Sequence, residues 1–219
     1  LACGQINCTV GDIEGNCLKI LARLREARAE GADIACFPEL AVCGYPPEDL
    51  LLKSTFISDV FEALQSLAGE VSDIVAIVGF PLRRDARLFN AAAVIHNGAI
   101  RGVYCKTLLP NYGVFDESRY FSPGTETPVF RIATPRGTVR FGVTICEDIW
   151  HAAPLAERAR QGAQLCVVTN ASPYEADKLA EREALLARQS AASGVAIAYA
   201  NAVGGQDSVV FDGASQLTD

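Results

Sequence analysis

Apolar positions along this chain follow two periods that alternate from one segment to the next. Apolar residues that recur every three to four positions predict helices over residues 14–30, 55–68, 154–162 and 178–193. Short runs that are wholly apolar or alternate with polar residues predict strands over residues 1–10, 34–37, 74–78, 88–95, 99–105, 129–132, 139–145, 165–169, 195–200 and 209–211. Strands that alternate with helices and hairpins are typical of a layered α/β protein, with a mixed sheet or sheets and helices outside.

Turn signals separate these segments without dividing the chain into domains. Asn97-Gly98 is a strong hairpin signal between two neighbouring strands, and Asp212-Gly213 predicts the start of a last hairpin. The loop at 107–127 is long for a compact domain, and such loops tend to be functional. Since there is no repeat or linker, we expect one domain over all 219 residues. Because the sequence stops just after its last turn, we expect a fragment of a longer protein.

The composition indicates a sizeable buried core and an acidic surface. Half of the 219 residues are hydrophobic, 21% are charged, and the net charge is −7 with a pI of about 4.9. This balance argues against nucleic acid or an anionic membrane as a partner. No apolar stretch approaches the roughly 20 residues that span a bilayer, and the first residues lack the pattern of a signal peptide. We therefore expect a cytoplasmic protein that binds neither nucleic acid nor membrane.

The eight cysteines do not form a metal-binding pattern. Most of them, such as Cys36, Cys105 and Cys166, stand in or beside apolar runs. That placement favours small core side chains in a reducing compartment. The chain has no Cys-x-x-Cys pair and only two histidines. We therefore expect no zinc site and no other metal centre.

Three predicted strands end close to a side chain that can react. Glu39, Lys106 and Cys146 each stand within two residues of such an end. Ligands of helix-covered sheets bind at the carboxyl ends of strands, so these side chains can converge if their strands are neighbours. Each also has an ordinary explanation, because surface-paired charges and buried thiols are more common than catalytic ones. Together, a carboxylate, an ammonium and a thiol make a coherent catalytic set.

Longer motifs surround these three residues. They are FPELAVCGYPPEDLL at 37–51, KTLLPNYGVFDE at 106–117, CEDIW at 146–150 and NASPY at 170–174, with GGQD at 204–207 and FDG at 211–213. Together they resemble the nitrilase superfamily of carbon–nitrogen hydrolases, and more closely the glutaminase domain of glutamine-dependent NAD synthetases. The resemblance spans nearly the whole chain.

The resemblance implies a fold and a set of catalytic residues. The implied fold is a four-layer αββα sandwich with mixed sheets and outer helices. The implied catalytic residues are Glu39, Lys106 and Cys146. Glu117 falls where the superfamily often has a second, supporting glutamate.

The family's contacts to glutamine fall on Tyr112, Ser172 and Lys178. Lys178 suits the α-carboxylate of glutamine, and the two hydroxyl groups suit its polar atoms. Residues 175–177 depart from the family's pattern. The ordinary explanations are loop packing for Tyr112, a turn for Ser172 and a solvated helix start for Lys178.

The implied reaction hydrolyses the side-chain amide of glutamine. Glu39 takes the proton of the Cys146 thiol, and Lys106 favours the thiolate that attacks the amide. Lys106 and the backbone N–H of Glu147 are the candidate donors to the oxyanion. Ammonia leaves, and water hydrolyses the remaining thioester to glutamate. This domain requires no metal or organic cofactor.

The resemblance also implies a second domain that this sequence lacks. The family's synthetase domain carries a Ser-Gly-Gly-x-Asp-Ser phosphate loop, and no such run occurs here. ATP and Mg are therefore expected only in a missing C-terminal ATP-pyrophosphatase (synthetase) domain, which would amidate deamido-NAD. The expected partners are glutamine, that domain and further copies of the chain in a homo-oligomer. The alternatives are a free-standing amidase or carbamoylase and a non-catalytic assembly domain.

Overall fold

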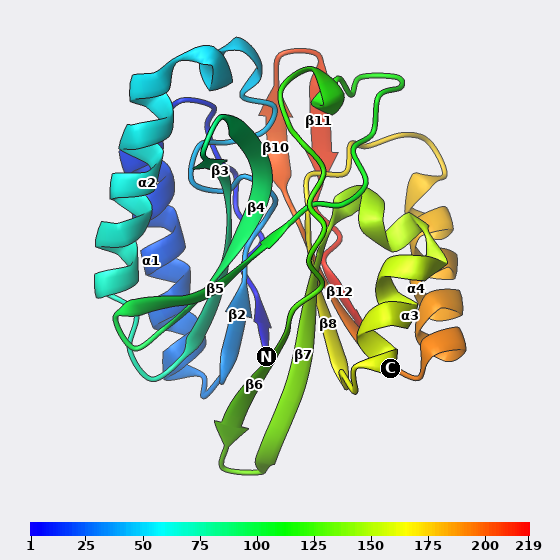
Figure 1. The fold of residues 1–219 in the computed structure, drawn as a ribbon. Helices are drawn as coiled ribbons and strands as arrows, with labels where there is room; N and C mark the ends of the chain where they lie inside the picture. The colour runs from blue at the N-terminus through cyan, green and yellow to red at the C-terminus, as the bar shows by residue number, and fades with distance from the viewer.

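Two five-stranded sheets lie face to face at the centre of the computed structural model, which describes residues 1–219 (Figure 1). The first sheet contains, in spatial order, β1 (Ala2–Cys3), β2 (Ile34–Cys36), β3 (Val75–Arg84), β4 (Arg87–His96) and β5 (Ala99–Cys105). The second contains β12 (Gln216–Thr218), β9 (Ala196–Asn201), β8 (Leu165–Asn170), β7 (Gly137–Ile145) and β6 (Val129–Thr134). A separate antiparallel ribbon consists of β10 (Val203–Gln206) and β11 (Val209–Asp212).

Helices cover the outer face of each sheet. The first sheet is covered by α1 (Ile13–Ala29) and α2 (Ser54–Gly69), and the second by α3 (Ala152–Arg160) and α4 (Lys178–Ser193) (Figure 1). Three short 3₁₀ helices lie in loops: η1 (Glu48–Leu52), η2 (Glu117–Arg119) and η3 (Cys146–Trp150). None of the helices combines the length and apolar character needed to cross a membrane. The layers are helix, sheet, sheet and helix, which confirms the expected αββα sandwich.

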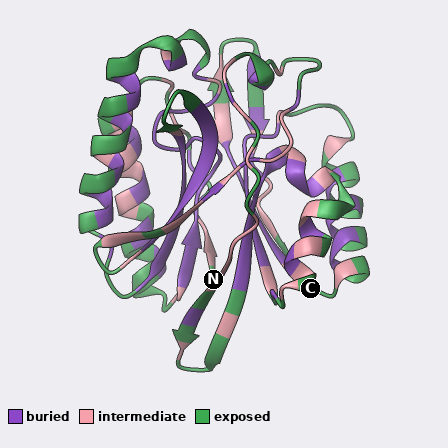
Figure 2. Ribbon diagram, viewed as in Figure 1, coloured by how far each residue is buried: buried purple, intermediate pink, exposed green.

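Side chains of each central strand alternate between two buried layers, because successive residues of a strand point to opposite faces. On β8, Val167 packs between the sheets, whereas Cys166 and Val168 belong to the core beneath α3 and α4. On β3, Ile77 packs between the sheets and Ala76 belongs to the core with α1 and α2. Burial on both faces explains why the strands are apolar almost throughout (Figure 2).

Strand direction brings several strand ends to one end of the sandwich. β1, β2 and β3 pair parallel, and β5 runs the same way because two antiparallel pairings separate it from β3. In the second sheet, β7, β8 and β9 pair parallel. The backbone N–H of Glu39, beyond β2, donates to the carbonyl of Asn170 at the end of β8 over 3.3 Å. The carboxyl ends of strands from both sheets therefore meet.

The first segment is shorter as a strand than the expected residues 1–10. Only Ala2–Cys3 are strand, and the N–H of Gly4 adds one hydrogen bond of 2.8 Å to the carbonyl of Cys36. The chain then turns towards the ribbon, where the carbonyl of Ile6 accepts from the N–H of Val203 over 3.3 Å. The expected strand is wrong beyond its start, because these residues find their backbone partners outside the sheet.

The last hairpin also differs from the expectation. It joins β10 to β11 through Asp207-Ser208, ahead of the predicted turn at Asp212-Gly213. Gly213, with φ of +68°, instead leads into β12, which pairs antiparallel with β9. This left-handed backbone favours glycine, and a Cβ atom here would also lie 2.4 Å from the side-chain amide of Gln5, which would have to move.

Candidate active site

The three predicted catalytic side chains follow β2, β5 and β7 at the end of the sandwich where both sheets meet. Lys106 Nζ lies 2.7 Å from Glu39 Oε1, and both side chains are fully buried. Cys146 is the first residue of η3 and is 4% exposed. The charges of Glu39 and Lys106 both act on its thiol. The structure therefore brings together a thiol, a carboxylate and an ammonium in one buried site.

Cys146 is a neutral thiol in this site. Burial raises the pKa of the Cys146 thiol well above its usual value, and the Glu39 carboxylate raises it further. Lys106 acts in the opposite direction but does not outweigh these two effects. The expected stabilisation of a thiolate by Lys106 is therefore insufficient by itself. A nucleophilic role for Cys146 would therefore require a base that accepts its proton.

A sharp turn from strand to helix presents the thiol. Cys146 has φ of +43°, a left-handed conformation that residues with a Cβ atom rarely adopt. The buried Asp148 carboxylate holds this turn by accepting from Ile145 N at 3.0 Å, Leu108 N at 2.9 Å and the Tyr104 hydroxyl at 2.7 Å. Sequence reasoning misses this role of Asp148, although a carboxylate two residues after Cys146 is a signal that could point to it.

Donors from three parts of the fold hold Glu39. Its Oε1 accepts from Lys106 Nζ and from Asn90 Nδ2, each at 2.7 Å. Its Oε2 accepts from the backbone N–H of Ala171, just beyond β8, at 3.1 Å. Asn90 and Ala171 are absent from the predicted site. The only signal for Asn90 is a polar residue inside the apolar strand β4.

Glu117 lies on the other side of Lys106, where the resemblance places a supporting glutamate. Its Oε1 accepts from Lys106 Nζ at 2.8 Å and from the Tyr45 hydroxyl at 2.9 Å. Burial is the main cause that raises the pKa of Glu117 to about 7, with Lys106 opposing it and Glu39 adding to it. Burial alone would lower the pKa of Lys106, but Glu39 and Glu117 raise it well above its usual value. Lys106 is therefore a cation between two carboxyl groups.

Glu117 makes the stability of the fold depend on pH. A carboxyl group whose pKa rises from 4.5 to about 7 on folding binds more protons in the folded state. The unfolding free energy should therefore fall as pH rises through this window, by about 3 kcal/mol at 1.36 kcal/mol per pKa unit. Glu117→Gln does not titrate and should lack this loss. Urea unfolding of the parent and of Glu117→Gln from pH 4.5 to 7.5 measures this loss. Unfolding free energies that change in parallel with pH in the two proteins would contradict the prediction.

Tyr112 and Glu147 lie at the solvent-facing side of the site. The Tyr112 hydroxyl donates to Glu147 Oε2 over 2.7 Å, and Glu147 Oε1 lies 3.2 Å from His151 Nε2. Tyr112 is 59% exposed, so a bound molecule can reach it. Glu147 is the second residue of η3, and the first N–H groups of a helix have no partner within the helix. Its N–H is therefore suited to an oxyanion.

Ser172 and Lys178 belong to the segment between β8 and α4. Ser172 is 3% exposed, and Asn201 holds it by accepting from its N–H at 2.9 Å and donating to its carbonyl at 3.2 Å. Lys178 Nζ lies 4.4 Å from the centre of the Trp150 ring, at the end of η3. It also pairs with Glu181 at 3.1 Å. Trp150 thus places Lys178 beside the turn that carries Cys146, but Lys178 already has a charged partner.

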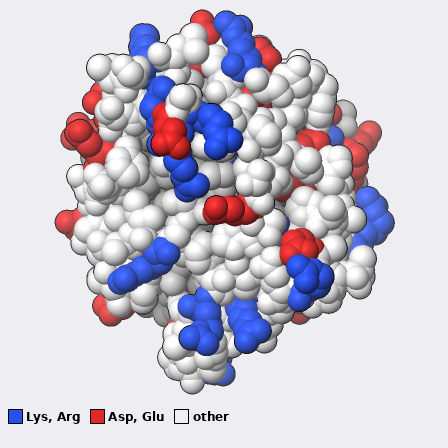
Figure 3. Space-filling view, viewed as in Figure 1, with Lys and Arg blue, Asp and Glu red and all other residues white.

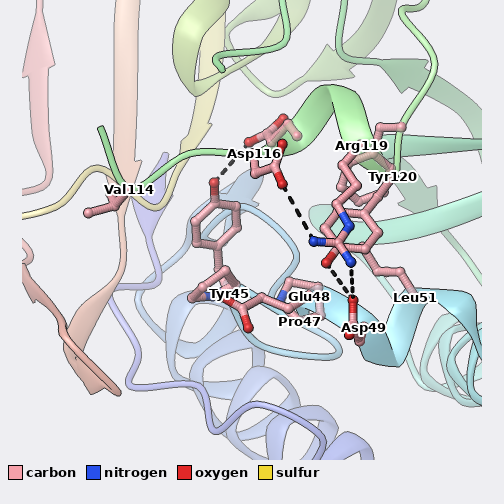
Figure 4. Close-up of a pocket in the computed structure, with 12 residues that line it drawn as sticks. Tyr45, Pro47, Glu48, Asp49, Leu51, Val114, Asp116, Arg119 and Tyr120 are labelled. Atoms are coloured by element: carbon pink, nitrogen blue, oxygen red, sulfur yellow. Dashed lines mark hydrogen bonds and ion pairs between the residues drawn. The ribbon is translucent and has the colours of Figure 1, made fainter. Parts of the chain in front are cut away.

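A cavity of about 190 Å³ is lined by Tyr45, Asp49 and Tyr120, among other residues (Figure 4). Its lining combines Glu117 and Tyr45 with the polar residues of η1 and η2. Asp49 accepts from the Tyr120 hydroxyl at 2.7 Å and from Arg119 at 3.3 Å. Neither Cys146 nor Lys106 lines this cavity, so it adjoins the catalytic cluster on the Glu117 side alone.

The structure contains no ready metal centre. No group of three or more His, Cys, Asp or Glu side chains is arranged to hold a metal ion. All eight cysteines are free thiols. On the face seen in Figure 3, acidic and basic side chains lie scattered among uncharged ones.

Curated relatives of this chain are glutamine-dependent NAD(+) synthetases. That of Xanthomonas campestris pv. campestris is 48% identical over 220 residues, which cover 100% of this chain and 40% of the relative. That of Thermotoga maritima is 45% identical and covers 98% of this chain and 37% of the relative. This chain therefore spans about 40% of the length of these relatives.

Solved structures agree with this likeness. Glutamine-dependent NAD+ synthetase from Acinetobacter baumannii, in complex with ADP, superposes with a TM-score of 0.94 at 37% identity over 99% of this chain and 40% of that one. An amidase from Nesterenkonia sp. shares the fold, with a TM-score of 0.84 at 24% identity over 99% of this chain and 80% of the amidase. The family model described as carbon–nitrogen hydrolase matches residues 1–219. The chain therefore belongs to the carbon–nitrogen hydrolase family.

Proposed function

We propose that this chain hydrolyses glutamine and releases ammonia, as the glutaminase part of a glutamine-dependent NAD synthetase. The observation that carries the proposal is the buried cluster in which Lys106 lies between Glu39 and Glu117, next to the Cys146 thiol. Relatives at 45–48% identity are glutamine-dependent enzymes, which supports glutamine as the substrate.

Glu39 acts as the general base and then as the general acid. It accepts the thiol proton as Cys146 Sγ attacks the side-chain carbonyl of glutamine, and it returns that proton to the leaving nitrogen. Such help contributes about 100–10,000-fold to a rate. Ammonia leaves, and a thioester to Cys146 remains. Glu39 then takes a proton from water, which hydrolyses the thioester to glutamate and frees the thiol.

Lys106 and the N–H of Glu147 stabilise the negative oxygen of the tetrahedral intermediates. One such fixed donor contributes about 100–1,000-fold to the rate. Lys106 suits this role because it is fully buried and held by two carboxyl groups, so it has little to reorganise during the reaction. The low polarity of the surroundings strengthens its attraction for the oxyanion.

Polar groups at the mouth, together with the buried Ser172 deeper in the site, recognise the amino-acid end of glutamine. The Tyr112 and Ser172 hydroxyls hydrogen-bond polar atoms of the substrate, and the Glu147 carboxylate attracts the α-ammonium. Lys178 binds the α-carboxylate after it leaves Glu181, from which it is separated by 3.1 Å in the free protein. Each charged group of glutamine thus meets a side chain of the opposite charge, the α-ammonium at Glu147 and the α-carboxylate at Lys178.

In the whole protein, the ammonia serves a C-terminal synthetase domain that requires ATP and Mg and amidates deamido-NAD. The chain spans about 40% of its curated relatives, which is consistent with such a domain. We also propose a homo-oligomer that works in the cytoplasm, a reducing compartment in which eight free thiols persist.

The main alternative is a free-standing amidase, since this chain covers 80% of the Nesterenkonia amidase with a TM-score of 0.84. The two functions differ in what they require of the substrate. A glutaminase uses the α-ammonium and α-carboxylate, whereas a general amidase accepts simple amides. A non-catalytic assembly domain has no use for three buried reactive side chains in one site.

The test measures release of glutamate or of the corresponding acid from glutamine, asparagine and butyramide. We expect kcat/KM for glutamine to exceed that for butyramide by at least about 100-fold, because two charged contacts of about 1.5–3 kcal/mol each are lost with the simple amide. Acid-quenched samples should carry a γ-glutamyl group on the peptide that contains Cys146. Equal rates on butyramide and glutamine would favour the amidase and overturn the proposal.

A further inference from the structure

Asn90 is a fully buried polar residue in the middle of the apolar strand β4. Its carbonyl accepts the backbone N–H of Lys106 over 2.8 Å, just beyond the last β4–β5 pair. Its main chain thus holds the residue that carries the catalytic ammonium. Because β4 is a central strand, the position of Asn90 is set by pairing on both sides.

The side chain of Asn90 connects both carboxyl groups of the site. Nδ2 donates to Glu39 Oε1 over 2.7 Å and lies 3.4 Å from Glu117 Oε2. The orientation of the amide follows from these neighbours, because the reverse would place Oδ1 against two carboxyl groups. Oδ1 itself is buried and has no hydrogen-bond partner. An unpartnered buried oxygen is unfavourable, so stability alone does not explain an amide at this position.

We propose that Asn90 is a positioning residue, which fixes the Glu39 carboxylate for proton transfer with Cys146. The inference rests on the role of Glu39 as the base in the proposed function. With Asn90, Lys106 and the N–H of Ala171 all donating to it, the carboxylate cannot rotate freely. Asn90 supplies its hydrogen bond without a charge, so Lys106 remains the single cation of the cluster.

Several other charged or titratable groups act on Glu39. They are Lys106 beyond β5, Glu117 in η2, Cys146 in η3, Tyr45 beyond β2 and Tyr199 in β9. Changes at Asn90 leave all five in place. When an uncharged side chain replaces Asn90, a shift in the pH profile therefore reports the loss of its amide contacts to Glu39 and Glu117.

The experiment measures the rate at which iodoacetamide alkylates Cys146 as a function of pH, with mass spectrometry of the Cys146 peptide. The rate follows the fraction of molecules in which Glu39 can accept the thiol proton. Asn90→Leu removes a donor from the carboxylate, which favours its protonated form. We expect the acid limb of the profile to move up by about one pH unit, a tenfold loss of rate at fixed pH.

Asn90→Asp is the second variant, because it preserves the shape of the side chain and places a third carboxyl group against Glu39 and Glu117. Its acid limb should move at least as far. Asn16→Leu is the matched control. Asn16 is also fully buried and donates to the carbonyls of Thr9 at 2.8 Å and Val42 at 3.3 Å. The Asn16→Leu variant should lower the urea midpoint without moving the pH profile of Cys146 alkylation, because Asn16 contacts neither Glu39 nor Glu117.

In glutamine turnover, both Asn90 variants should lower kcat about tenfold or more and leave KM within twofold, because Asn90 does not reach the mouth. Folded Asn90→Leu or Asn90→Asp protein with the parental pH profile would overturn the proposal. The alkylation assay uses no substrate. If the parent protein did not hydrolyse glutamine, the proposed function would be wrong. The pH profiles of alkylation would still test whether Asn90 positions Glu39.

Discussion

Glutamine hydrolysis is expected to fall by at least about 10,000-fold when Cys146 is replaced by alanine, because loss of the nucleophile removes the covalent route entirely. What remains is the stabilisation that the oxyanion donors give to direct attack by water. The fold should persist, since the change removes one buried sulfur atom from a turn that Asp148 holds through its own hydrogen bonds. Glutamate release under substrate saturation measures the effect.

Cys166→Ala is the matched control for this variant. Cys166 is likewise a fully buried thiol whose pKa is raised by burial, but it lies on β8 in the core beneath α3 and α4. Its replacement should cost some stability and leave turnover within about twofold. If Cys146→Ala hydrolysed glutamine as fast as the parent, Cys146 would not be the nucleophile.

The second large effect is expected for Lys106→Met, which keeps the length of the side chain and removes its charge. Glu39 and Glu117 would then be buried without a cation, and removal of one partner from a buried ion pair costs about 3–5 kcal/mol. We expect this loss of unfolding free energy at pH 8, together with loss of turnover. Urea unfolding and glutamate release measure the two effects.

The loss should depend on pH in a defined direction. Without Lys106, no cation opposes the burial and the Glu39 charge that raise the pKa of Glu117, so Glu117 holds its proton to higher pH in the folded state than in the unfolded state. The destabilisation is therefore smallest at pH 5 and grows as pH rises. Lys178→Met is the control for stability. The ionic partners of Lys178 are exposed acids of its own segment, and its other contact is the Trp150 ring, so we expect a loss of less than about 1 kcal/mol. An equal loss for Lys106→Met at pH 5 and pH 8 would contradict the assigned network.

Turn residues and the period of apolar positions explain which helices and strands could be predicted from the sequence. Asn97 and Gly98 both have positive φ, +45° and +73°, as a two-residue hairpin between β4 and β5 requires. The helix over Lys178–Ser193 ends at Gly194, with φ of +68°. These features depend on neighbours in the chain. The first strand beyond its start and the last hairpin were wrong because Ile6 and Gly213 take their backbone partners from segments that the predicted elements did not include.

The residues of the site likewise include some that could be predicted from the sequence and others that could not. Glu39, Lys106 and Cys146 could be proposed together because each follows a strand, and strand ends of a parallel sheet share one edge. The residues that position these three side chains could not be proposed from the sequence. Asn90 lies 51 positions from Glu39, and Ala171 lies 132 positions from it. No local pattern marks such a pair, since only the packing of the two sheets brings them within hydrogen-bond distance.

Periodicity and turn residues by themselves therefore determined a layered α/β protein. The motifs, through their resemblance to a family, indicated the αββα sandwich and the three candidate residues, because all of these are local properties of the sequence. Only the tertiary structure decided the state of those residues. It buried Lys106 between Glu39 and Glu117, left Cys146 as a neutral thiol and aimed the Asn90 amide at Glu39. Protonation and orientation depend on desolvation and on partners far away in the chain, and both exist only once the two sheets have packed.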